Sequence, residues 1–287
     1  MKFAAFRDAL GTGLSIVDAH GGHRGLRTSD PRFPGSLETL VGLDRPGREA
    51  AAAALTAGEA IDAGAVEWLP PLARPGKIVC VGLNYADHTA ESGMKQPDYP
   101  TLFARFTTTL VGHGAPVVRP KVSEQFDYEG ELVAVIGKGG RHIPRDSALD
   151  HVFGWSVFND VSVRDYQFKS PQWTVGKNFD ATGAFGPWLV TADEVPPGGR
   201  GLTLETRLNG TVVQHATTDD LIFDVATLIA IISEAITLEP GDLIVTGTPA
   251  GVGAARKPQL WMKPGDVCEV EIQGVGLLVN RVVDESI

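Results

Sequence analysis

The chain has few cysteines, no long apolar run and no excess of positive charge, and each absence argues against a class of protein. Only two of its 287 residues are cysteine, Cys80 and Cys268, and each falls in a strand-like pattern. We therefore expect buried reduced cysteines rather than a disulfide framework or a structural zinc site. The most apolar stretch, residues 225–232, is too short to cross a bilayer.

Acidic residues outnumber basic ones by 35 to 25, which gives a formal net charge of -10. This charge argues against nucleic-acid backbones and anionic membrane surfaces as partners. The opening segment MKFAAFRDALGTG lacks the continuous apolar run of a signal peptide, so we expect a cytoplasmic protein. A hydrophobic content of 43% is typical of a globular chain with a sizeable core.

Two parts of the chain differ in character. Residues 1–72 contain a hairpin pattern and an alanine-rich stretch, residues 48–61, that predicts a helix. They contain no catalytic grouping. The segment LPPLARPGK, with three prolines and one glycine, predicts a boundary near residue 73. We therefore predict a small N-terminal domain, residues 1–72, and a larger domain, residues 73–287.

Short apolar runs separated by turn residues dominate the larger part, as in KIVCVGL, ELVAVIG and FGWSVFND. Asn209 and Gly210 mark a hairpin between two strand patterns. Apolar residues keep a helical spacing from Leu221 onward, and Asp219 and Asp220 suit the start of that helix. Together these patterns indicate a mixed, β-rich α+β fold.

Three carboxylates stand at the ends of two of these strand patterns. Glu129 and Glu131 lie two residues apart where ELVAVIG begins, so both side chains point to one face of a strand. Asp160 follows the run FGWSVF and could join them from a neighbouring strand. Converging carboxylates repel unless a cation lies between them, and an all-oxygen set suits Mg²⁺ first, then Mn²⁺ or Ca²⁺. The alternative is that the pair is only the solvated end of a strand.

Other polar residues offer the chemistry that such a site needs, although each also has a plain structural interpretation. Lys177, beside Gly176, is either a solvated lysine or a fixed positive charge that polarises a carbonyl group. Arg164 and Gln167 follow Asp160 by four and seven residues and face one way if the segment is helical. A polar helix surface explains these two residues as well.

His88 and Glu91 lie three residues apart in a predicted short helix, and therefore on one helical face. They are either an exposed pair or a general base, His88, oriented by a carboxylate and able to activate water. A short helix here also suits a lid. Thr248, in the glycine-rich TGTPAGVG, could supply a hydroxyl or amide group to a substrate carboxylate. This segment lacks the lysine and the spacing of a phosphate-binding loop.

Taken together, five segments of the chain resemble the fumarylacetoacetate hydrolase family, and they occur in the family's order over roughly residues 75–285. The resemblance implies a catalytic domain with a rolled, mixed β-sandwich, preceded by the small N-terminal α+β domain of longer members. It also implies a homodimer as the usual assembly. The segments are KIVCVGLNYADHTAESG, DYEGELVAVIGKGGRHIP, FNDVSVRDYQ, QWTVGKNFD with FGPWLVT, and LEPGDLIVTGTPAGVG.

The resemblance implies roles for five residues in the metal site and the lid. Glu129, Glu131 and Asp160 match the positions that hold Mg²⁺ or Mn²⁺ in the family. His88 and Glu91 match a catalytic pair on a lid helix.

The resemblance also implies a substrate site. Arg164, Gln167 and Thr248 match positions that line it, as does Lys177, which we group with the catalytic residues. The chain departs from the family at two places. Arg105, in LFARF, stands where many members have lysine, and we group it with the substrate-binding residues. The segment FKSP, residues 168–171, lacks the glycine-containing insert of some members that cleave acylpyruvates.

The function that these observations predict is divalent-metal-dependent hydrolysis of a C–C bond in a β-diketo acid of aromatic or related catabolism. Such acids include acylpyruvates, fumarylpyruvate and diketo-deoxy acids. In this hypothesis the metal and Lys177 stabilise the enolate of a chelating 2-oxo acid. His88, held by Glu91, activates the water that attacks a second carbonyl group.

Two alternatives use the same site without the hydrolytic water. One is isomerisation or tautomerisation of a 2-hydroxydienoate, and the other is decarboxylation of an oxaloacetate-type acid. A non-catalytic metal-binding protein is the alternative from another class, and it predicts no turnover of any 2-oxo acid.

Overall fold

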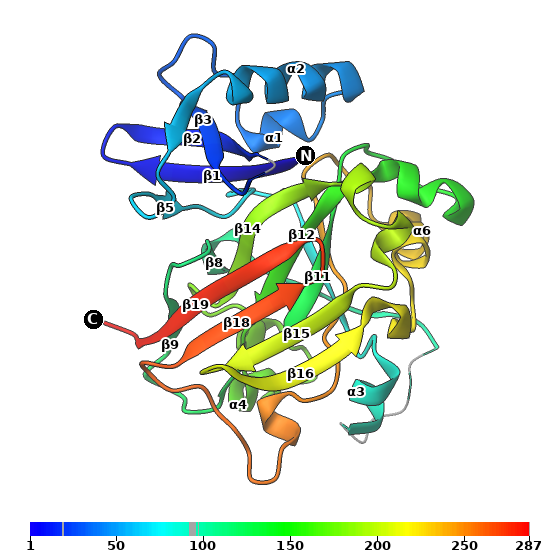
Figure 1. Cartoon of the computed structure of the whole chain (residues 1–287). Helices are drawn as coiled ribbons and strands as arrows, with labels where there is room; N and C mark the ends of the chain where they lie inside the picture. Colours follow the sequence, from blue (N-terminus) through cyan, green and yellow to red (C-terminus); the bar gives the residue numbers. More distant parts are fainter. Residues whose placement is uncertain (19, 92–95, 97, 287) are drawn as a thin grey trace.

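Two β-sheets packed face to face form the framework of the larger part of the chain (Figure 1). The computed structural model describes residues 1–18, 20–91, 96 and 98–286, without the side chains of residues 88–90. Most neighbouring strands are antiparallel, but β17 with β6, β14 with β8 and β19 with β9 are parallel. The predicted mixed, β-rich α+β fold is therefore confirmed.

The larger sheet has 12 strands in the order β4-β3-β2-β1-β14-β12-β11-β17-β6-β7, with β5 beside β1 and β8 beside β14. Its strands are β1 Lys2–Asp8, β2 Gly11–Val17, β3 His23–Arg27, β4 Glu59–Ile61, β5 Glu67–Trp68, β6 Ile78–Gly82, β7 Thr101–Ala104, β8 Leu110–Val111, β11 Gly130–Ile136, β12 Val152–Asp160, β14 Gly183–Thr191 and β17 Leu243–Val245.

The second sheet has five strands in the order β16-β15-β18-β19-β9, and a separate pair joins β10 to β13. These strands are β9 Val117–Arg119, β10 Phe126–Asp127, β13 Ser162–Val163, β15 Thr203–Leu208, β16 Thr211–Thr217, β18 Val267–Ile272 and β19 Gly276–Asp284. The helices are α1 Leu37–Leu40, α2 Arg45–Thr56, α3 Ala86–Glu91, α4 Arg164–Gln167, α5 Thr174–Lys177 and α6 Val225–Ala235.

The strand β11 is buried along its whole length because both of its faces are covered. Leu132 and Ala134 point into the core that the second sheet also lines, whereas Val133 and Val135 pack in the core shared with the N-terminal part. Burial on both faces explains why the sequence reads as one continuous apolar run. Glu131 precedes Val133 in the same alternation.

The N-terminal part joins the larger sheet directly. The strand β1 pairs with β14, with Phe3 opposite Leu189, so one sheet runs through both parts of the chain. Figure 1 shows α2 lying across the N-terminal strands. The predicted hairpin is confirmed as β1 and β2. The division of the chain near residue 73 stays a prediction.

Two helix predictions were partly wrong, and in both cases a local cap decided the boundary. The alanine-rich helix α2 begins at Arg45, capped by Asp44, and ends at Thr56, so that Glu59–Ile61 forms strand β4 instead. The later helix α6 begins at Val225, where the Asp224 carboxylate accepts a hydrogen bond from the backbone N–H of Thr227. The residues predicted to start it, 219 and 220, lie in a 3₁₀ turn.

Both cysteines are buried and free, as predicted, in β6 and β18. Burial, together with the nearby carboxylates of Asp160 and Glu131, raises the pKa of the Cys80 thiol well above its ordinary value. In the described part of the chain, no helix combines the length and the apolar character needed to cross a membrane.

Candidate metal and substrate site

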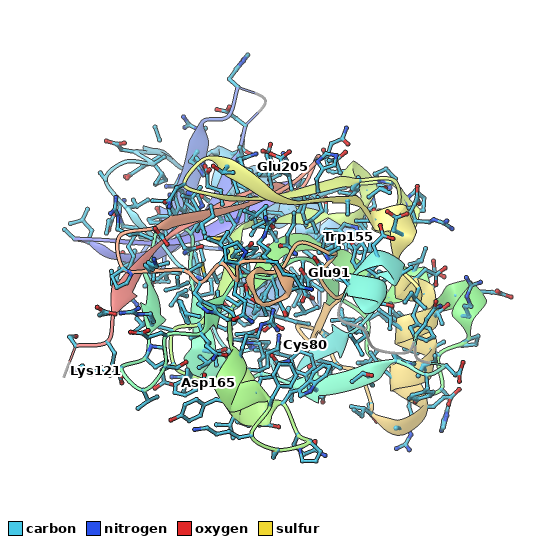
Figure 2. All side chains as sticks on the ribbon, turned by 90° about the horizontal axis from the view of Figure 1, so that it is seen from below. Cys80, Glu91, Lys121, Trp155, Asp165 and Glu205 are labelled. Carbon is cyan, nitrogen blue, oxygen red and sulfur yellow. The ribbon has the colours of Figure 1, made fainter. Side chains whose placement is uncertain are left out.

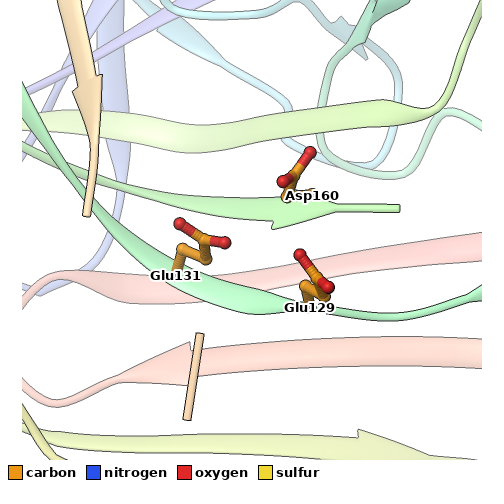
Figure 3. Close-up of side chains that lie close together, drawn as sticks. All are labelled: Glu129, Glu131 and Asp160. Carbon is orange, nitrogen blue, oxygen red and sulfur yellow. The ribbon is translucent and has the colours of Figure 1, made fainter. Parts of the chain in front are cut away.

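The three carboxylates predicted from the sequence converge at one end of the β11–β12 pair. The antiparallel register places Gly130 opposite Asn159, and the N–H of Asp160 donates to the carbonyl oxygen of Glu129 at 2.8 Å. The strand end that carries Asp160 therefore lies beside the strand start that carries Glu129 and Glu131. Figure 3 shows the three side chains close together, and one oxygen of each lies within 4.8 Å of the others.

Lys177 bridges two of these carboxylates. It ends the short helix α5, and its side chain is only 2% exposed. Its Nζ lies 2.6 Å from Oε2 of Glu129 and 2.7 Å from Oδ2 of Asp160. Burial alone would lower the pKa of Lys177, but the charges of Asp160 and Glu129 outweigh this and raise it. The lysine is therefore a buried ammonium group, not a solvated surface residue.

Two arginines hold the remaining oxygens of the same carboxylates. Arg164, the first residue of α4, places Nη2 at 2.7 Å from Oε1 of Glu129. Arg105 donates from Nη1 to Oδ1 of Asp160 and from Nη2 to the hydroxyl of Thr182. Both guanidinium groups are buried, so each ion pair acts in a medium of low polarity.

Glu131 has a different environment from Glu129 and Asp160. Its Oε2 accepts a hydrogen bond from the N–H of Gly247 at 2.5 Å, but no lysine or arginine among the described residues pairs with it. Its side chain is 2% exposed. Burial, followed by the nearby charges of Asp160 and Glu129, raises the pKa of Glu131 well above its ordinary value.

The charge balance of the site favours a bound cation. Among the described residues, four buried carboxylates, those of Asp127, Glu129, Glu131 and Asp160, face three buried cations, those of Lys177, Arg105 and Arg164. Within this described set Glu131 is the acid without a lysine or arginine in ion-pair contact, so it is the acid that a bound cation would compensate most. A divalent ion with oxygen ligands fits this set, since hard cations such as Mg²⁺ and Mn²⁺ prefer carboxylates. Glu129, Glu131 and Asp160 are the residues that would hold it.

A cavity of about 310 Å³ opens beside the carboxylates. Its polar wall includes the predicted residues Glu129, Glu131, Arg164, Gln167, Lys177, Thr248 and Glu91. Other lining residues are apolar or aromatic, namely Val81, Phe103, Phe168, Trp173 and Val252. A concave site with a few convergent polar groups and an apolar remainder is typical of a small-molecule site.

Hydrogen bonds hold three of the lining side chains in place, those of Arg164, Gln167 and Thr248. Nη1 of Arg164 donates to Oε1 of Gln167 at 2.9 Å within the single turn of α4. The hydroxyl of Thr248 donates to the carbonyl oxygen of Gly130 at 3.0 Å and accepts from Nε2 of Gln214 at 2.8 Å. The plain interpretation of Arg164 and Gln167 as a polar helix surface does not hold, because both are buried.

The remaining predicted residues are Arg105, Glu91 and His88. Arg105 does not line the cavity and lies behind Asp160, where it supports that carboxylate. Glu91, at the end of α3, lines the cavity, and its Oε2 accepts a hydrogen bond from the N–H of Gly251 at 2.9 Å (Figure 2). The side chain of His88 lies outside the described residues, so the predicted pair with Glu91 stays a prediction.

Sequence reasoning missed Asp127 and the aromatic residues Phe103 and Trp173. Asp127, Glu129 and Glu131 are spaced two residues apart, as are residues on one face of a strand. This spacing could have indicated that Asp127 belongs with the other two acids. The two aromatic residues come together only in the fold, where their ring centroids lie 5.6 Å apart in an edge-to-face arrangement. No local pattern in the sequence indicates that contact.

A buried three-acid cluster beside a small-molecule cavity, in a mixed β-sandwich, defines a metal-dependent enzyme. The chain belongs to the fumarylacetoacetate hydrolase family, because the family model described as "Fumarylacetoacetate (FAA) hydrolase C-terminal" matches residues 77–283. The resemblance inferred from the five sequence segments is thereby confirmed.

Relatives along nearly the whole chain have different activities in their names. Oxaloacetate tautomerase FAHD2A, mitochondrial, from Homo sapiens is 40% identical over 289 residues, covering 99% of this chain and 92% of the relative. Fumarylacetoacetate hydrolase from psychrophilic Exiguobacterium antarcticum superposes with a TM-score of 0.84 at 34% identity, covering 99% of this chain and 100% of the other. Maleylpyruvate hydrolase from Sphingobium sp. SYK-6, in complex with manganese(II) ion and pyruvate, gives a TM-score of 0.81 at 28% identity, with both chains fully covered.

Proposed function

We propose that this protein catalyses the interconversion of the enol and keto forms of a 2-oxo acid of the oxaloacetate type, in a reaction that depends on Mg²⁺ or Mn²⁺. The observation that carries the proposal is the buried ammonium group of Lys177, fixed at 2.6 and 2.7 Å from the carboxylates of Glu129 and Asp160. Both lie beside Glu131, which forms no ion pair with a lysine or arginine among the described residues. The 40% identity to an oxaloacetate tautomerase over 99% of the chain supports this choice of substrate.

The chain's own residues supply most of the chemistry that tautomerisation needs. The ammonium group of Lys177 lines the cavity as a preorganised positive charge, and such a charge stabilises an enolate oxygen without further reorganisation. The guanidinium group of Arg164 lines the same wall and offers a planar donor to a substrate carboxylate. The chemistry that a bound divalent cation supplies is Lewis-acid polarisation of the keto group.

Tautomerisation also needs a group that moves a proton at the substrate carbon. The carboxylate of Glu91 lines the cavity from the end of α3, whereas Glu129 and Glu131 line it from the start of β11. We assign proton transfer to Glu91 together with His88, three residues earlier in the same helix. In the enol-to-keto direction the substrate loses its hydroxyl proton and gains one at the neighbouring carbon, so no co-reactant is consumed.

Hydrolysis of a C–C bond in a β-diketo acid is the second candidate. It is favoured by the apolar half of the cavity, where Phe103, Phe168 and Trp173 leave room for a longer substrate tail than that of a four-carbon acid. It is also supported by the structural similarity to a hydrolase solved with manganese and pyruvate. In this reaction His88 and Glu91 would activate water instead of carrying a proton at carbon.

Parallel assays with Mg²⁺ separate the two candidates. Loss of the enol absorbance of freshly dissolved oxaloacetate reports tautomerisation, and consumption of an acylpyruvate reports hydrolysis. We expect a metal-dependent acceleration of the first reaction that exceeds the second. A wild-type protein that hydrolyses an acylpyruvate efficiently but leaves the enol decay at its uncatalysed rate would reverse the order of the candidates. Inactivity in both assays would favour a non-catalytic metal-binding protein.

A further inference from the structure

Asp127 is a buried carboxylate to which neither the metal site nor the proposed reaction assigns a role. It ends β10, where it pairs with Ser162, and this pairing places it beside the start of α4. Its side chain is 0% exposed, and it does not line the cavity. Any influence on a substrate must therefore pass through the residues that it contacts.

The carboxylate of Asp127 joins two separate parts of the cavity wall. Its Oδ2 accepts hydrogen bonds from Nε of Arg164 at 2.8 Å and from the N–H of Ala254 at 3.0 Å. Its Oδ1 accepts from the N–H of Gly253 at 2.7 Å and from that of Tyr128 at 2.9 Å. Arg164 and Ala254 both line the cavity, so a single carboxylate connects α4 with the segment after β17.

The contact with Nε determines how the guanidinium group of Arg164 is oriented. Its three nitrogens face different groups: Nε faces Asp127, Nη1 faces Gln167 and Nη2 faces Glu129. Because the guanidinium group is planar, these contacts fix its plane as well as its position. Without Asp127, the described carboxylate left in ion-pair contact with Arg164 would be Glu129, which is also a proposed metal ligand.

The segment after β17 is shaped for close approach to Asp127. A Cβ atom added at Gly253 would lie 1.9 Å from the carbonyl oxygen of Leu260 and 2.7 Å from Oδ1 of Asp127. Only glycine therefore allows the backbone to come near enough for the hydrogen bonds to Asp127 and from the N–H of Leu260. The contact between Asp127 and Gly253 therefore depends on both residues, the buried carboxylate and the glycine that has no side chain.

We propose that Asp127 is a positioning residue for substrate binding, which holds the Arg164 guanidinium group and the cavity wall at residues 252–255 in the orientation that receives a 2-oxo acid. This inference rests on the proposed function, because it assumes that Arg164 binds a substrate carboxylate. The three acids at positions 127, 129 and 131 then have different roles. Glu129 and Glu131 bind the cation, and Asp127 orients Arg164, which binds the organic anion.

The test compares Asp127→Asn with Asp165→Asn as a matched control. Asp165 is the next residue after Arg164 in α4, and it accepts a hydrogen bond from the hydroxyl of Ser123 at 2.5 Å without lining the cavity (Figure 2). The readouts are the calorimetric Kd of oxalate for the Mn²⁺-loaded protein, and KM and kcat for oxaloacetate. We expect Asp127→Asn to raise the oxalate Kd and KM about tenfold to a hundredfold, with a smaller change in kcat, because it weakens a hydrogen bond to a charged group. Asp165→Asn should leave both unchanged.

A double-mutant cycle distinguishes positioning through Arg164 from a merely structural role. If Asp127 acts through Arg164, the oxalate Kd of Asp127→Asn combined with Arg164→Gln should equal that of Arg164→Gln alone. Additive losses in the cycle would overturn the proposal, as would an unchanged oxalate Kd in Asp127→Asn. If Asp127→Asn does not fold, Arg164→Lys serves instead, because lysine keeps the positive charge but has no Nε–H for Asp127. An oxalate Kd as tight as that of the wild type in Arg164→Lys would then overturn the proposal.

The binding measurement also separates this inference from the proposed function. If the wild-type protein turns over no 2-oxo acid, the proposed function fails. The oxalate Kd measurements still test the role of Asp127 in that case, because they measure anion binding without catalysis.

Discussion

Glu131 is the residue whose surroundings most directly indicate a bound cation. It is buried, accepts a hydrogen bond from the N–H of Gly247, and has no lysine or arginine partner among the described residues. Its neighbours Glu129 and Asp160 already share Lys177. The three acids are therefore unequal, and Glu131 is the one whose charge depends most on a metal ion for compensation.

Replacing Glu131 with Gln should weaken Mn²⁺ binding at least about a hundredfold, since even changes outside the ligand shell cost tenfold to a hundredfold. The metal-free variant should also melt at a higher temperature than the metal-free wild type at neutral pH, because the raised pKa of Glu131 costs stability there and Gln does not titrate. Calorimetry with Mn²⁺ and thermal unfolding in EDTA measure the two effects. Glu271→Gln, an exposed residue paired with Arg207, is the control. Wild-type Mn²⁺ affinity in Glu131→Gln would remove it from the ligand set.

Lys177→Met should separate metal binding from catalysis. The variant keeps the length of the side chain but loses the ammonium group, and we expect kcat to fall about 10²–10³-fold, as when other preorganised donors are removed. The metal-free protein should lose about 3–5 kcal/mol of stability, because Glu129 and Asp160 are left buried without their shared partner. Added Mn²⁺ should restore much of this loss. A variant with near wild-type kcat would show that Lys177 has only a structural role.

At the scale of single residues, the sequence indicated the acids but not their support. The spacing of Glu129 and Glu131 predicted a shared face, and the β11–β12 register then brought Asp160 beside them. The burial of Lys177 and Arg164 could not be read locally, because it arises where α4 and α5 pack against the ends of these strands. The charged groups of Lys177 and Arg164 stay buried there because each has an ion-pair partner.

At the scale of elements, two one-turn helices carry the cationic groups that line the described cavity wall. Helix α4 presents Arg164 and Gln167, and helix α5 presents Lys177. The two pack at Gly176, where an added Cβ atom would lie 2.2 Å from the backbone nitrogen of Gln167 and 2.4 Å from its Cα. The absence of a side chain at this position therefore sets the spacing between the two binding groups.

Gly176→Ala should push α4 and α5 apart. We expect a loss of about 1–3 kcal/mol in unfolding free energy, as for other overpacked sites, together with a raised KM because Gln167 and Arg164 move with α4. Denaturant unfolding and steady-state kinetics measure the two effects. Gly64→Ala is the control, since its nearest neighbour would be Oδ1 of Asp62 at an ordinary 3.5 Å. Equal stability and KM in both variants would contradict the proposed role of the helix contact.

Elements that local sequence patterns determine were predicted well. Elements that form only through packing against distant parts of the chain were not. Asn209 and Gly210, both with positive φ, form the predicted hairpin turn between β15 and β16. The segment after Asp160 shows little periodicity because α4 and α5 are single turns that depend on packing. Asp219 and Asp220 precede Asp224, so the sequence pattern does not distinguish Asp224 as the N-cap of α6.

At the scale of the whole molecule, the N-terminal part covers one face of the central sheet. A single core cluster contains Phe3, Leu14 and Leu55 from the N-terminal part together with Val133 and Phe185 from the larger part. The strand β1 also pairs with β14 at Leu189 and Val190, and without it this part of the β14 edge would be unpaired. The two parts therefore share apolar surface that each needs to bury.

A protein shortened to residues 73–287 should fold poorly for this reason. We expect aggregation, or a melting temperature far below that of the full chain, because apolar side chains of β11, β12 and β14 would be exposed to water. Size-exclusion chromatography and circular dichroism test this expectation. A monodisperse fragment with the melting temperature of the full chain would show that the larger part is an independent domain. The predicted homodimer and cytoplasmic location stay predictions, and light scattering of the full chain addresses the first.

The central claim is that the Glu129, Glu131 and Asp160 cluster holds a divalent cation that, with Lys177, makes a 2-oxo acid enolise. Exchange of the methyl hydrogens of pyruvate for deuterium, followed by proton NMR in D₂O, tests enolisation directly because pyruvate offers no C–C bond for this enzyme to hydrolyse. The account predicts exchange that requires Mg²⁺ or Mn²⁺ and that is lost in EDTA, in Glu131→Gln and in Lys177→Met. Exchange at the wild-type rate in Glu131→Gln, or none in the metal-loaded wild type, would contradict it.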